Sequence, residues 1–349
     1  MSLNFSYTSH TLQFRFDART SRGAISEHKV YFINLWQEDT PEISGVGECA
    51  PLAGLSIDDR PDLEQKLQEA MRLINGQQVQ LQPGKPLPQE LQLEEWPALR
   101  FALETALLDL QHGGRRQLYN NAFSRGEAGI PINGLIWMGD SSFMQEQIEK
   151  KLKEGYSCLK LKIGGLDFVQ ELEILQSIRE VAGAQELTVR VDANGAFSPQ
   201  EAYKKLERLA RYELHSIEQP IRQGQHEAMA QLCAYTPVPI ALDEELIGVQ
   251  RPEEKAQLLE QIKPQYIILK PTLVGGLAAS AEWIEMAQQR NIGWWMTSAL
   301  ESNIGLNGIS QFTANYDITM PQGMGTGQLY HNNIPSALQI EQGQLWYRR

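Results

Sequence analysis

Cysteine is scarce in this sequence of 349 residues, which contains only Cys49, Cys158 and Cys233. An odd number of cysteines without a CxxC spacing indicates neither a disulfide framework nor a zinc site. The six histidines form no HxH or HExxH pattern, so the common histidine-based metal motifs are missing as well. We therefore expect a protein of a reduced, cytoplasmic setting.

Long apolar runs and basic clusters are also lacking. No uninterrupted apolar stretch approaches the length that crosses a bilayer, and the N-terminus lacks a basic start followed by an apolar run. The net charge of -12 argues against nucleic acid as a partner, and no basic cluster offsets it locally. We expect neither a membrane nor a nucleic acid as partner. A small anionic substrate fits if a metal and a few lysines supply positive charge.

What the sequence does contain is a series of charged residues at the ends of short apolar segments. Lys162 ends Cys-Leu-Lys-Leu-Lys, and Asp192, Glu218, Asp243 and Lys270 lie at similar ends, about 25 to 30 residues apart. One strand and one helix fill such an interval. Parallel repetition of this unit predicts a TIM-type barrel, whose active site lies at the carboxyl ends of the strands. All five side chains would then point into one mouth.

Three carboxylates in one mouth predict a bound divalent cation. Asp192, Glu218 and Asp243 could each be a turn or capping residue, because Asp-Ala-Asn-Gly and Glu-Gln-Pro are typical of strand exits. Together, however, the three would repel one another unless a cation neutralised them. Oxygen ligands favour a hard ion such as Mg²⁺, with Mn²⁺ as a substitute. Asn194 and Glu244 are weaker candidates, expected to orient the ligands or the facing lysine.

Two lysines on one segment provide a candidate base. Lys160 and Lys162 are two residues apart, so on a strand both face the same side. A lone Lys-x-Lys is more often a solvent-facing pair, because lysine is rarely buried. A closed barrel has no exposed edge, so we expect both side chains to face its interior. Two close ammonium groups lower each other's pKa, which would favour a neutral base near pH 7, with Lys270 facing them across the metal.

The regions around these segments have simpler patterns. Alternating apolar residues from Leu3 to about Leu35, and in the segment that ends at Pro51, predict antiparallel strands. Periodic apolar residues predict a helix near Asp59–Asn75 and another over Trp96–Gln111. Residues 76–95 lack periodicity and are expected to form mostly linker. At the other end of the chain, the alternating residues 340–347 predict a strand that pairs with the N-terminal region.

The motifs together resemble the enolase superfamily and, more narrowly, its o-succinylbenzoate synthase family. The resemblance covers nearly the whole chain and includes Gly-Glu-Cys-Ala-Pro-Leu, Ser-Ala-Leu-Glu-Ser and Pro-Gln-Gly-Met-Gly-Thr-Gly. It implies metal-dependent dehydration of 2-succinyl-6-hydroxy-2,4-cyclohexadiene-1-carboxylate to o-succinylbenzoate, through an enediolate. It also implies a (β/α)7β barrel with an α+β capping domain: residues 1–125 form the capping domain, 126–327 the barrel, and 328–349 a tail that returns to the capping domain.

The resemblance further implies roles for individual residues. Lys162 is the base, assisted by Lys160, and Lys270 is the cationic group on the opposite face; Asp192, Glu218 and Asp243 hold the metal. The substrate is a small carboxylate, and a homo-oligomer is left open. The loops expected to contact substrate contribute Ser21, Arg22, Gly23, Leu52, Leu55, Ser298, Glu301, Ser302 and Gly323.

Other reactions share the lysine and carboxylate pattern. Dipeptide epimerases and N-acylamino-acid racemases of the same superfamily are similar at these positions, and an inactive metal-binding barrel is a third reading. The last barrel segment reads Gln322-Gly-Met-Gly-Thr and lacks the Asp-x-Asp pair that resembles the amino-group anchor of the epimerases. Its three glycines suggest a phosphate loop only superficially, because no Walker lysine follows. The absence of the Asp-x-Asp pair favours the synthase.

Overall fold

Three long antiparallel strands form the N-terminal sheet: β1 (Leu3–Thr20), β2 (Gly23–Gln37) and β3 (Thr40–Cys49). The computed structural model describes residues 2–20, 23–137 and 140–348, so Ser21 and Arg22 of the expected substrate loop lie outside the described residues. In β1 the apolar residues that alternate along the strand, such as Phe5, Leu12 and Phe14, are buried. The antiparallel sheet expected from the sequence is therefore present.

Two helices, α1 (Leu63–Asn75) and α2 (Pro97–Gln111), pack with this sheet around an N-terminal core. Proline at the first position of α2 needs no N–H partner there, so the helix begins where the sequence predicted. The backbone of α2 lies directly on β3, because a Cβ at Gly47 would be 1.9 Å from the carbonyl oxygen of Ala102. The prediction that residues 76–95 form mostly linker is partly wrong. The core includes Val79, Leu81, Leu91 and Leu93, and Gln89–Leu91 forms a short 3₁₀ helix, η1.

A seven-stranded parallel sheet builds the second part of the molecule, with the strands in sequence order from β5 to β11. Each strand is short and bounded by a helix or turn. The strands are β5 (Gly134–Ile136), β6 (Cys158–Lys162), β7 (Thr188–Asp192), β8 (Ser216–Glu218), β9 (Ile240–Leu242), β10 (Tyr266–Leu269) and β11 (Gly293–Met296).

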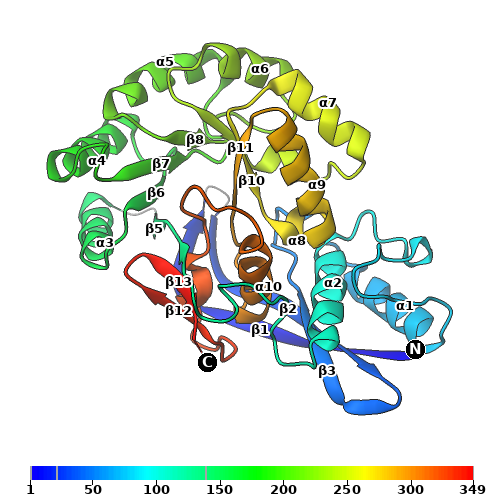
Figure 1. Ribbon diagram of the computed structural model, residues 1–349. Helices are drawn as coiled ribbons and strands as arrows, with labels where there is room; N and C mark the ends of the chain where they lie inside the picture. Colours follow the sequence, from blue (N-terminus) through cyan, green and yellow to red (C-terminus); the bar gives the residue numbers. More distant parts are fainter. Residues whose placement is uncertain (1, 21–22, 138–139, 349) are drawn as a thin grey trace.

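The helices of this part surround the curled sheet on its outer side, as Figure 1 shows. Among the described residues, no helix is both long enough and apolar enough to cross a membrane. The helices are α3 (Ser141–Lys153), α4 (Phe168–Val181), α5 (Pro199–Leu209), η2 (Ala210–Tyr212), α6 (His226–Tyr235), η3 (Glu244–Leu246), α7 (Pro252–Ile262), α8 (Pro271–Val274), α9 (Gly276–Gln289), α10 (Asn303–Thr313) and η4 (Gly325–Gln328).

The gap between the first and last strands of this sheet is bridged by Gln322 and Gly323 rather than by a regular strand. Gln322 forms a parallel bridge with Ile132, next to β5, and Gly323 forms one with Thr297, next to β11. A side chain at position 323 would not fit, because its Cβ would be 1.7 Å from the Thr297 hydroxyl. The coarse fold class is thus confirmed, while the exact capping of the barrel mouth and the domain boundaries stay predictions.

The C-terminal tail differs from the expectation in one respect. Residues 340–347 are not one strand but part of a hairpin, β12 (Leu338–Glu341) and β13 (Gln344–Tyr347). Through β13 the hairpin pairs with β4 (Ile130–Pro131) rather than with the N-terminal sheet. The preceding stretch contacts β1, where Tyr330 forms a bridge with Phe14. The expected strand pairing was therefore wrong.

The close approach of α2 to β3 predicts a packing defect if Gly47 gains a methyl group. Replacing Gly47 with Ala should lower the free energy of unfolding by ~1–3 kcal/mol, because two backbones must separate. Gly183→Ala is the matched control, since the nearest atom to its added methyl lies 4.0 Å away, and we expect a change below ~0.5 kcal/mol. Urea unfolding followed by circular dichroism measures both; equal midpoints would contradict the packing account.

Candidate active site

The charged residues predicted to converge do so because their strands pair in register. Lys162, Asp192 and Glu218 are direct partners across the neighbouring strands β6, β7 and β8. They occupy the last position of each strand, so their side chains emerge at the same edge of the sheet. Asp243 and Lys270 follow the last residues of β9 and β10. The spacing argument from the sequence thus placed all five correctly.

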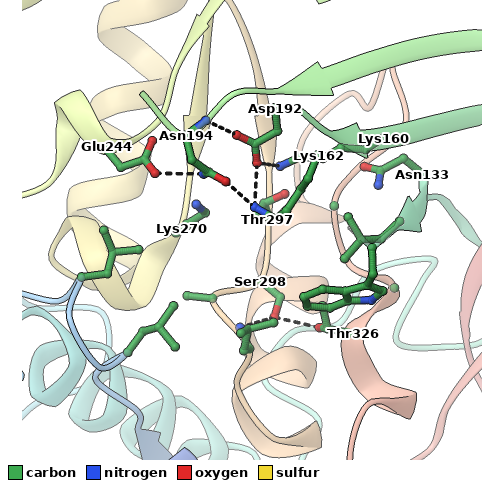
Figure 2. Close-up of a pocket in the computed structure, with 18 residues that line it drawn as sticks. Asn133, Lys160, Lys162, Asp192, Asn194, Glu244, Lys270, Thr297, Ser298 and Thr326 are labelled. Atoms are coloured by element: carbon green, nitrogen blue, oxygen red, sulfur yellow. Dashed lines mark hydrogen bonds and ion pairs between the residues drawn. The ribbon is translucent and has the colours of Figure 1, made fainter. Parts of the chain in front are cut away.

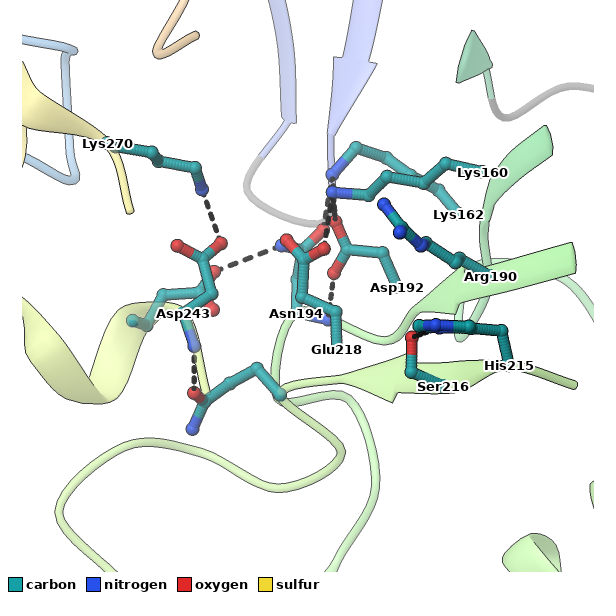
Figure 3. Close-up of polar contacts among 12 residues, drawn as sticks. Lys160, Lys162, Arg190, Asp192, Asn194, His215, Ser216, Glu218, Asp243 and Lys270 are labelled. Carbon is teal, nitrogen blue, oxygen red and sulfur yellow. Dashed lines mark hydrogen bonds and ion pairs between the residues drawn. The ribbon is translucent and has the colours of Figure 1, made fainter. Parts of the chain in front are cut away.

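Ion pairs connect the lysines to the carboxylates, as Figure 3 shows. Lys160 Nζ lies 3.0 Å from Asp192 Oδ2 and 2.6 Å from Glu218 Oε2, and Lys162 Nζ lies 3.2 Å from the same Asp192 oxygen. Lys270 pairs with Asp243 from the other side of the cluster. The carboxylates therefore separate Lys270 from the Lys160–Lys162 pair.

The carboxylates do not share one electrostatic environment. Burial opposes ionisation of Asp192, but the charges of Lys160 and Lys162 outweigh it and lower its pKa. Burial and then the neighbouring charge of Asp192 raise the pKa of Glu218 well above its usual range. Glu218 is consequently the carboxylate whose negative charge is least compensated.

The expected lowering of the lysine pKa is wrong for Lys160. Burial does disfavour its ammonium form, but the charges of Asp192 and Glu218 are stronger and raise its pKa. The pKa of Lys270 is raised in the same way: burial lowers it, but the charges of Asp243, Glu218 and Glu244 together outweigh burial. The effect that sequence reasoning missed is the attraction by carboxylates at contact distance, which exceeds the repulsion between the two ammonium groups.

The chemistry of this cluster fits a hard cation. Oε1 of Glu218 is buried and accepts no hydrogen bond from any described residue. Three buried carboxylates with such a free oxygen supply the ligand type that Mg²⁺ prefers. In the described part of the chain, however, no group of three or more acidic, histidine or cysteine residues is already arranged as a metal cage. The lysine ammonium groups pair with the carboxylates, so they would have to move aside for a cation.

Asn194 and Glu244 lie where they can orient these groups. Asn194 Oδ1 accepts a hydrogen bond from Lys162 Nζ at 2.6 Å, and its side-chain amide donates to Glu244 Oε1 at 3.0 Å. Its backbone N–H donates to Asp192 Oδ1 at 3.0 Å, which requires a left-handed backbone with φ of 43°. The unpredicted Gln219 has a similar place, since its side-chain oxygen accepts from the backbone N–H of Asp243.

One pocket opens onto the charged cluster (Figure 2). Lys160, Lys162, Asp192 and Lys270 form its charged side. Leu52 and Leu55, from the loop that follows β3, contribute apolar surface from the N-terminal part of the molecule. Ser298 and Gly323 also line the pocket, as the sequence predicted.

Two of the expected substrate contacts, Glu301 and Ser302, are not brought to this pocket. Glu301 and Ser302 are fully buried behind the wall and do not line it. Glu301 instead accepts hydrogen bonds from Ser298 Oγ at 2.7 Å and from Thr272 Oγ1 at 2.5 Å. Gly23 begins β2, and its expected contact with substrate stays a prediction. Glu301 therefore fixes the Ser298 hydroxyl and is not a substrate contact in itself.

Several lining residues were not predicted. Trp137 closes the predicted first barrel strand and could have been found from its position at the strand end, as could Thr297. Asn133 and Leu135 carry no such signal, because nothing in the sequence shows which residues of a short strand face the pocket. The lining residues missed by the sequence reasoning are Asn133, Leu135, Trp137, Thr297, Ala299, Leu300, Gly325 and Thr326.

Comparison with known proteins decides the family. A family model described as Enolase C-terminal domain-like matches residues 143–348. The o-succinylbenzoate synthase of Desulfotalea psychrophila is 48% identical, in an alignment 366 positions long that covers 98% of this chain and 98% of that protein. The chain belongs to the o-succinylbenzoate synthase family of the enolase superfamily. The crystal structure of MenC from the same organism covers 99% of this chain and all of its own, with 44% identity and a TM-score of 0.87.

More distant relatives share the fold of this synthase family. The N-succinylamino acid racemase of Thermus thermophilus is 28% identical over 84% of this chain and 77% of its own length. The dipeptide epimerase of Enterococcus faecalis, solved as a complex with Mg and the dipeptide L-Leu-L-Tyr, is 17% identical but has a TM-score of 0.84 over 100% of this chain and 98% of its own. The epimerase therefore shares the architecture of this chain despite its low sequence identity.

Proposed function

We infer that this chain is an o-succinylbenzoate synthase, a hydro-lyase that dehydrates 2-succinyl-6-hydroxy-2,4-cyclohexadiene-1-carboxylate. The observation that carries this inference is the 48% identity with a synthase over the full length of both proteins. The site agrees with it, because Lys162 and Lys270 face one pocket from opposite sides of the carboxylates. The three cysteines, all free and buried, support a reducing, cytoplasmic location.

We propose that Asp192, Glu218 and Asp243 hold Mg²⁺, for which Mn²⁺ can substitute. When bound, the ion neutralises the carboxylates and acts as a Lewis acid for the negative charge that develops on the substrate carboxylate. Enzymes of this superfamily use a lysine or histidine base together with Mg²⁺, as is known for the superfamily in general. Asn194 and Glu244 support this arrangement through their contacts with Lys162 and with each other.

In the proposed reaction Lys162 both takes and returns a proton. Its neutral Nζ removes the hydrogen on the carbon that bears the carboxylate, which leaves an enediolate. The resulting ammonium then gives this proton to the departing hydroxyl on the neighbouring ring carbon, and water leaves. The C–H and C–O bonds break, one ring C=C bond forms, and the ring becomes aromatic. Both groups leave from the face of Lys162, so the elimination is syn.

The other lysines need only keep their charge. The raised pKa values of Lys160 and Lys270 keep both ammonium groups protonated at neutral pH, which suits electrostatic stabilisation of the enediolate. The remaining pocket residues suit the rest of the substrate. Leu52 and Leu55 offer apolar contacts to the ring. The succinyl carboxylate would be bound by the backbone near Gly323 and by the Ser298 hydroxyl, which must first turn away from Glu301 in order to donate to it.

An activity comparison tests the function itself. The purified protein with Mg²⁺ should convert the cyclohexadiene substrate to o-succinylbenzoate, followed by the change in ultraviolet absorbance as the ring becomes aromatic. Dipeptides should be epimerised slowly or not at all, measured by polarimetry. Efficient epimerisation without dehydration would replace the synthase with an epimerase, and inactivity on both substrates would favour a barrel without catalysis.

The division of labour between the lysines predicts different exchange defects. An N-succinylamino acid has an exchangeable α-hydrogen but no leaving group, so its deuterium uptake in D₂O reports proton removal alone. Lys162→Ala should abolish uptake on the face of the enantiomer that Lys162 approaches, and lower dehydration by several orders of magnitude. Lys270→Ala should also impair dehydration, yet retain uptake on that face.

Lys205→Ala is the control for this comparison. Lys205 pairs with Glu201 at 2.6 Å on α5 and is not among the residues that line the pocket, so its loss should change neither uptake nor turnover. Mass spectrometry of the recovered compound measures uptake in all three variants. Uptake that survives in Lys162→Ala and disappears in Lys270→Ala would reverse the assignment.

A further inference from the structure

His28 of β2 lies between two loops that both line the pocket. Its side chain is buried, with 4% of its surface exposed. Nε2 lies 3.2 Å from the carbonyl oxygen of Pro51, directly before the Leu52–Leu55 loop. Nδ1 lies 3.0 Å from the carbonyl oxygen of Leu300, in the wall that carries Ser298. A single imidazole thus contacts the N-terminal part of the molecule and the barrel wall together.

The loop that carries Leu52 has space on its far side. Leu52 lines the active-site pocket and also a second cavity of about 320 Å³, whose walls include His28, Pro51 and Ala53. Leu52 itself is buried and its N–H donates to Ser56 Oγ at 2.7 Å, so the loop is closed by its own hydrogen bonds and borders a cavity on either side. The contact between His28 and Pro51 is therefore positioned to prevent the loop from moving away from the substrate.

The wall that carries Ser298 also needs support. Leu300 has a φ of 67°, a left-handed conformation that is strained for a residue other than glycine. Besides the contact with His28, its carbonyl oxygen accepts a hydrogen bond from Tyr330 Oη at 2.5 Å. Its N–H donates to Ser298 Oγ at 3.0 Å. The position of the Ser298 hydroxyl is thus linked to how firmly the Leu300 backbone is held.

The two carbonyl contacts make the protonation state of His28 important. A neutral imidazole carries one N–H and can donate to only one carbonyl, whereas an imidazolium donates to both. Burial lowers the pKa of His28, against smaller opposing effects of the two carbonyls and of the charges on Glu301 and Asp59. The imidazolium, which forms both bonds, is therefore populated only at the acid end of the pH range.

Other charged groups also face this histidine. Glu27 and Lys29 neighbour it on β2, and Arg60 and Glu64 line the same cavity from the loop and from α1. Lys29 is paired with Glu64 at 2.7 Å and Arg60 with Asp62 at 2.6 Å, so these two positive charges are largely compensated. The charges on Asp59 and Glu301 are the ones that favour the imidazolium.

We propose that His28 is a positioning residue that ties the Leu52–Leu55 loop to the Leu300 wall and thereby closes the substrate pocket. The proposal rests on the proposed function, because it assumes that this pocket binds the substrate. With one donor the imidazole holds one wall, and with two it holds both. Substrate should therefore bind more tightly when His28 is protonated, while the chemical step at Lys162 is affected much less.

Steady-state kinetics from pH 8.5 down to the lowest pH at which the protein stays folded test the proposal on three variants. In His28→Asn the amide nitrogen replaces Nδ1, in His28→Gln it replaces Nε2, and His28→Phe keeps only the ring shape. His28→Phe should raise KM roughly three- to tenfold per lost bond, with kcat changed by less than about twofold. The other two should lie between it and wild type.

The pH profile separates a tie from simple packing. The KM of wild type should be lowest at the acid end and rise as the imidazole loses its proton. The KM values of His28→Asn and His28→Gln should not show this rise, because an amide side chain does not titrate. His10→Asn is the control, because His10 also lies near a carbonyl oxygen, that of Asn332 at 3.3 Å, but does not line the pocket. Variants of His28 with the KM and pH profile of wild type would overturn the proposal.

Amide hydrogen exchange keeps this test separate from the proposed function. If wild type does not dehydrate the substrate, the function fails, but the tie can still be measured at the amides of Leu52, Leu55 and Ser56. Their exchange with deuterium is followed in the free protein. His28→Phe should accelerate it several-fold, while the exchange of the amides of α5 should remain unchanged. Equal loop exchange in wild type and His28→Phe would exclude the tie whatever the activity.

Discussion

Repulsion among three buried carboxylates is the constraint around which this structure is organised. Strand register brings together Asp192, Glu218 and Asp243, so the repulsion between their charges cannot be relieved by moving one side chain. Lysines compensate part of this charge, and Glu218 keeps an unpaired buried oxygen. A site with this imbalance offers the ligands that a divalent cation prefers, and lysines lie on either side of the position where a substrate carboxylate would meet the proposed ion.

The N-terminal part of the molecule supports this site from behind the pocket wall. Glu48 of β3 is fully buried and accepts hydrogen bonds from Ser302 N at 2.8 Å and Gly305 N at 2.7 Å, at the start of α10. Carboxylates are favourable at a helix N-terminus. Glu301 accepts bonds from the Ser298 hydroxyl in the same wall. Buried polar bonds therefore connect the antiparallel sheet to the residue proposed to bind the succinyl group.

The barrel and its charged cluster could be predicted from the sequence because both depend on the regular spacing of the strands along the chain. A fixed interval between strand ends determines which side chains meet, so Lys162, Asp192 and Glu218 were placed without knowledge of packing. Contacts between distant loops have no period. The burial of Glu301, the hairpin at the C-terminus and the bridging of Pro51 to Leu300 by His28 depend on how the two parts pack, and no local pattern encodes them. The prediction of a lowered pKa for Lys160 was wrong for a related reason, because this pKa depends on distances between strands.

The central claim is that one cation site and two opposed lysines form a single catalytic unit. A crystal structure of the protein with Mg²⁺ and o-succinylbenzoate tests it most directly. The account predicts electron density for the ion among Asp192, Glu218 and Asp243, the lysine ammonium groups withdrawn from these carboxylates, and the product carboxylate between Lys162 and Lys270. A metal bound elsewhere, or a product with both lysines on the same face, would contradict it.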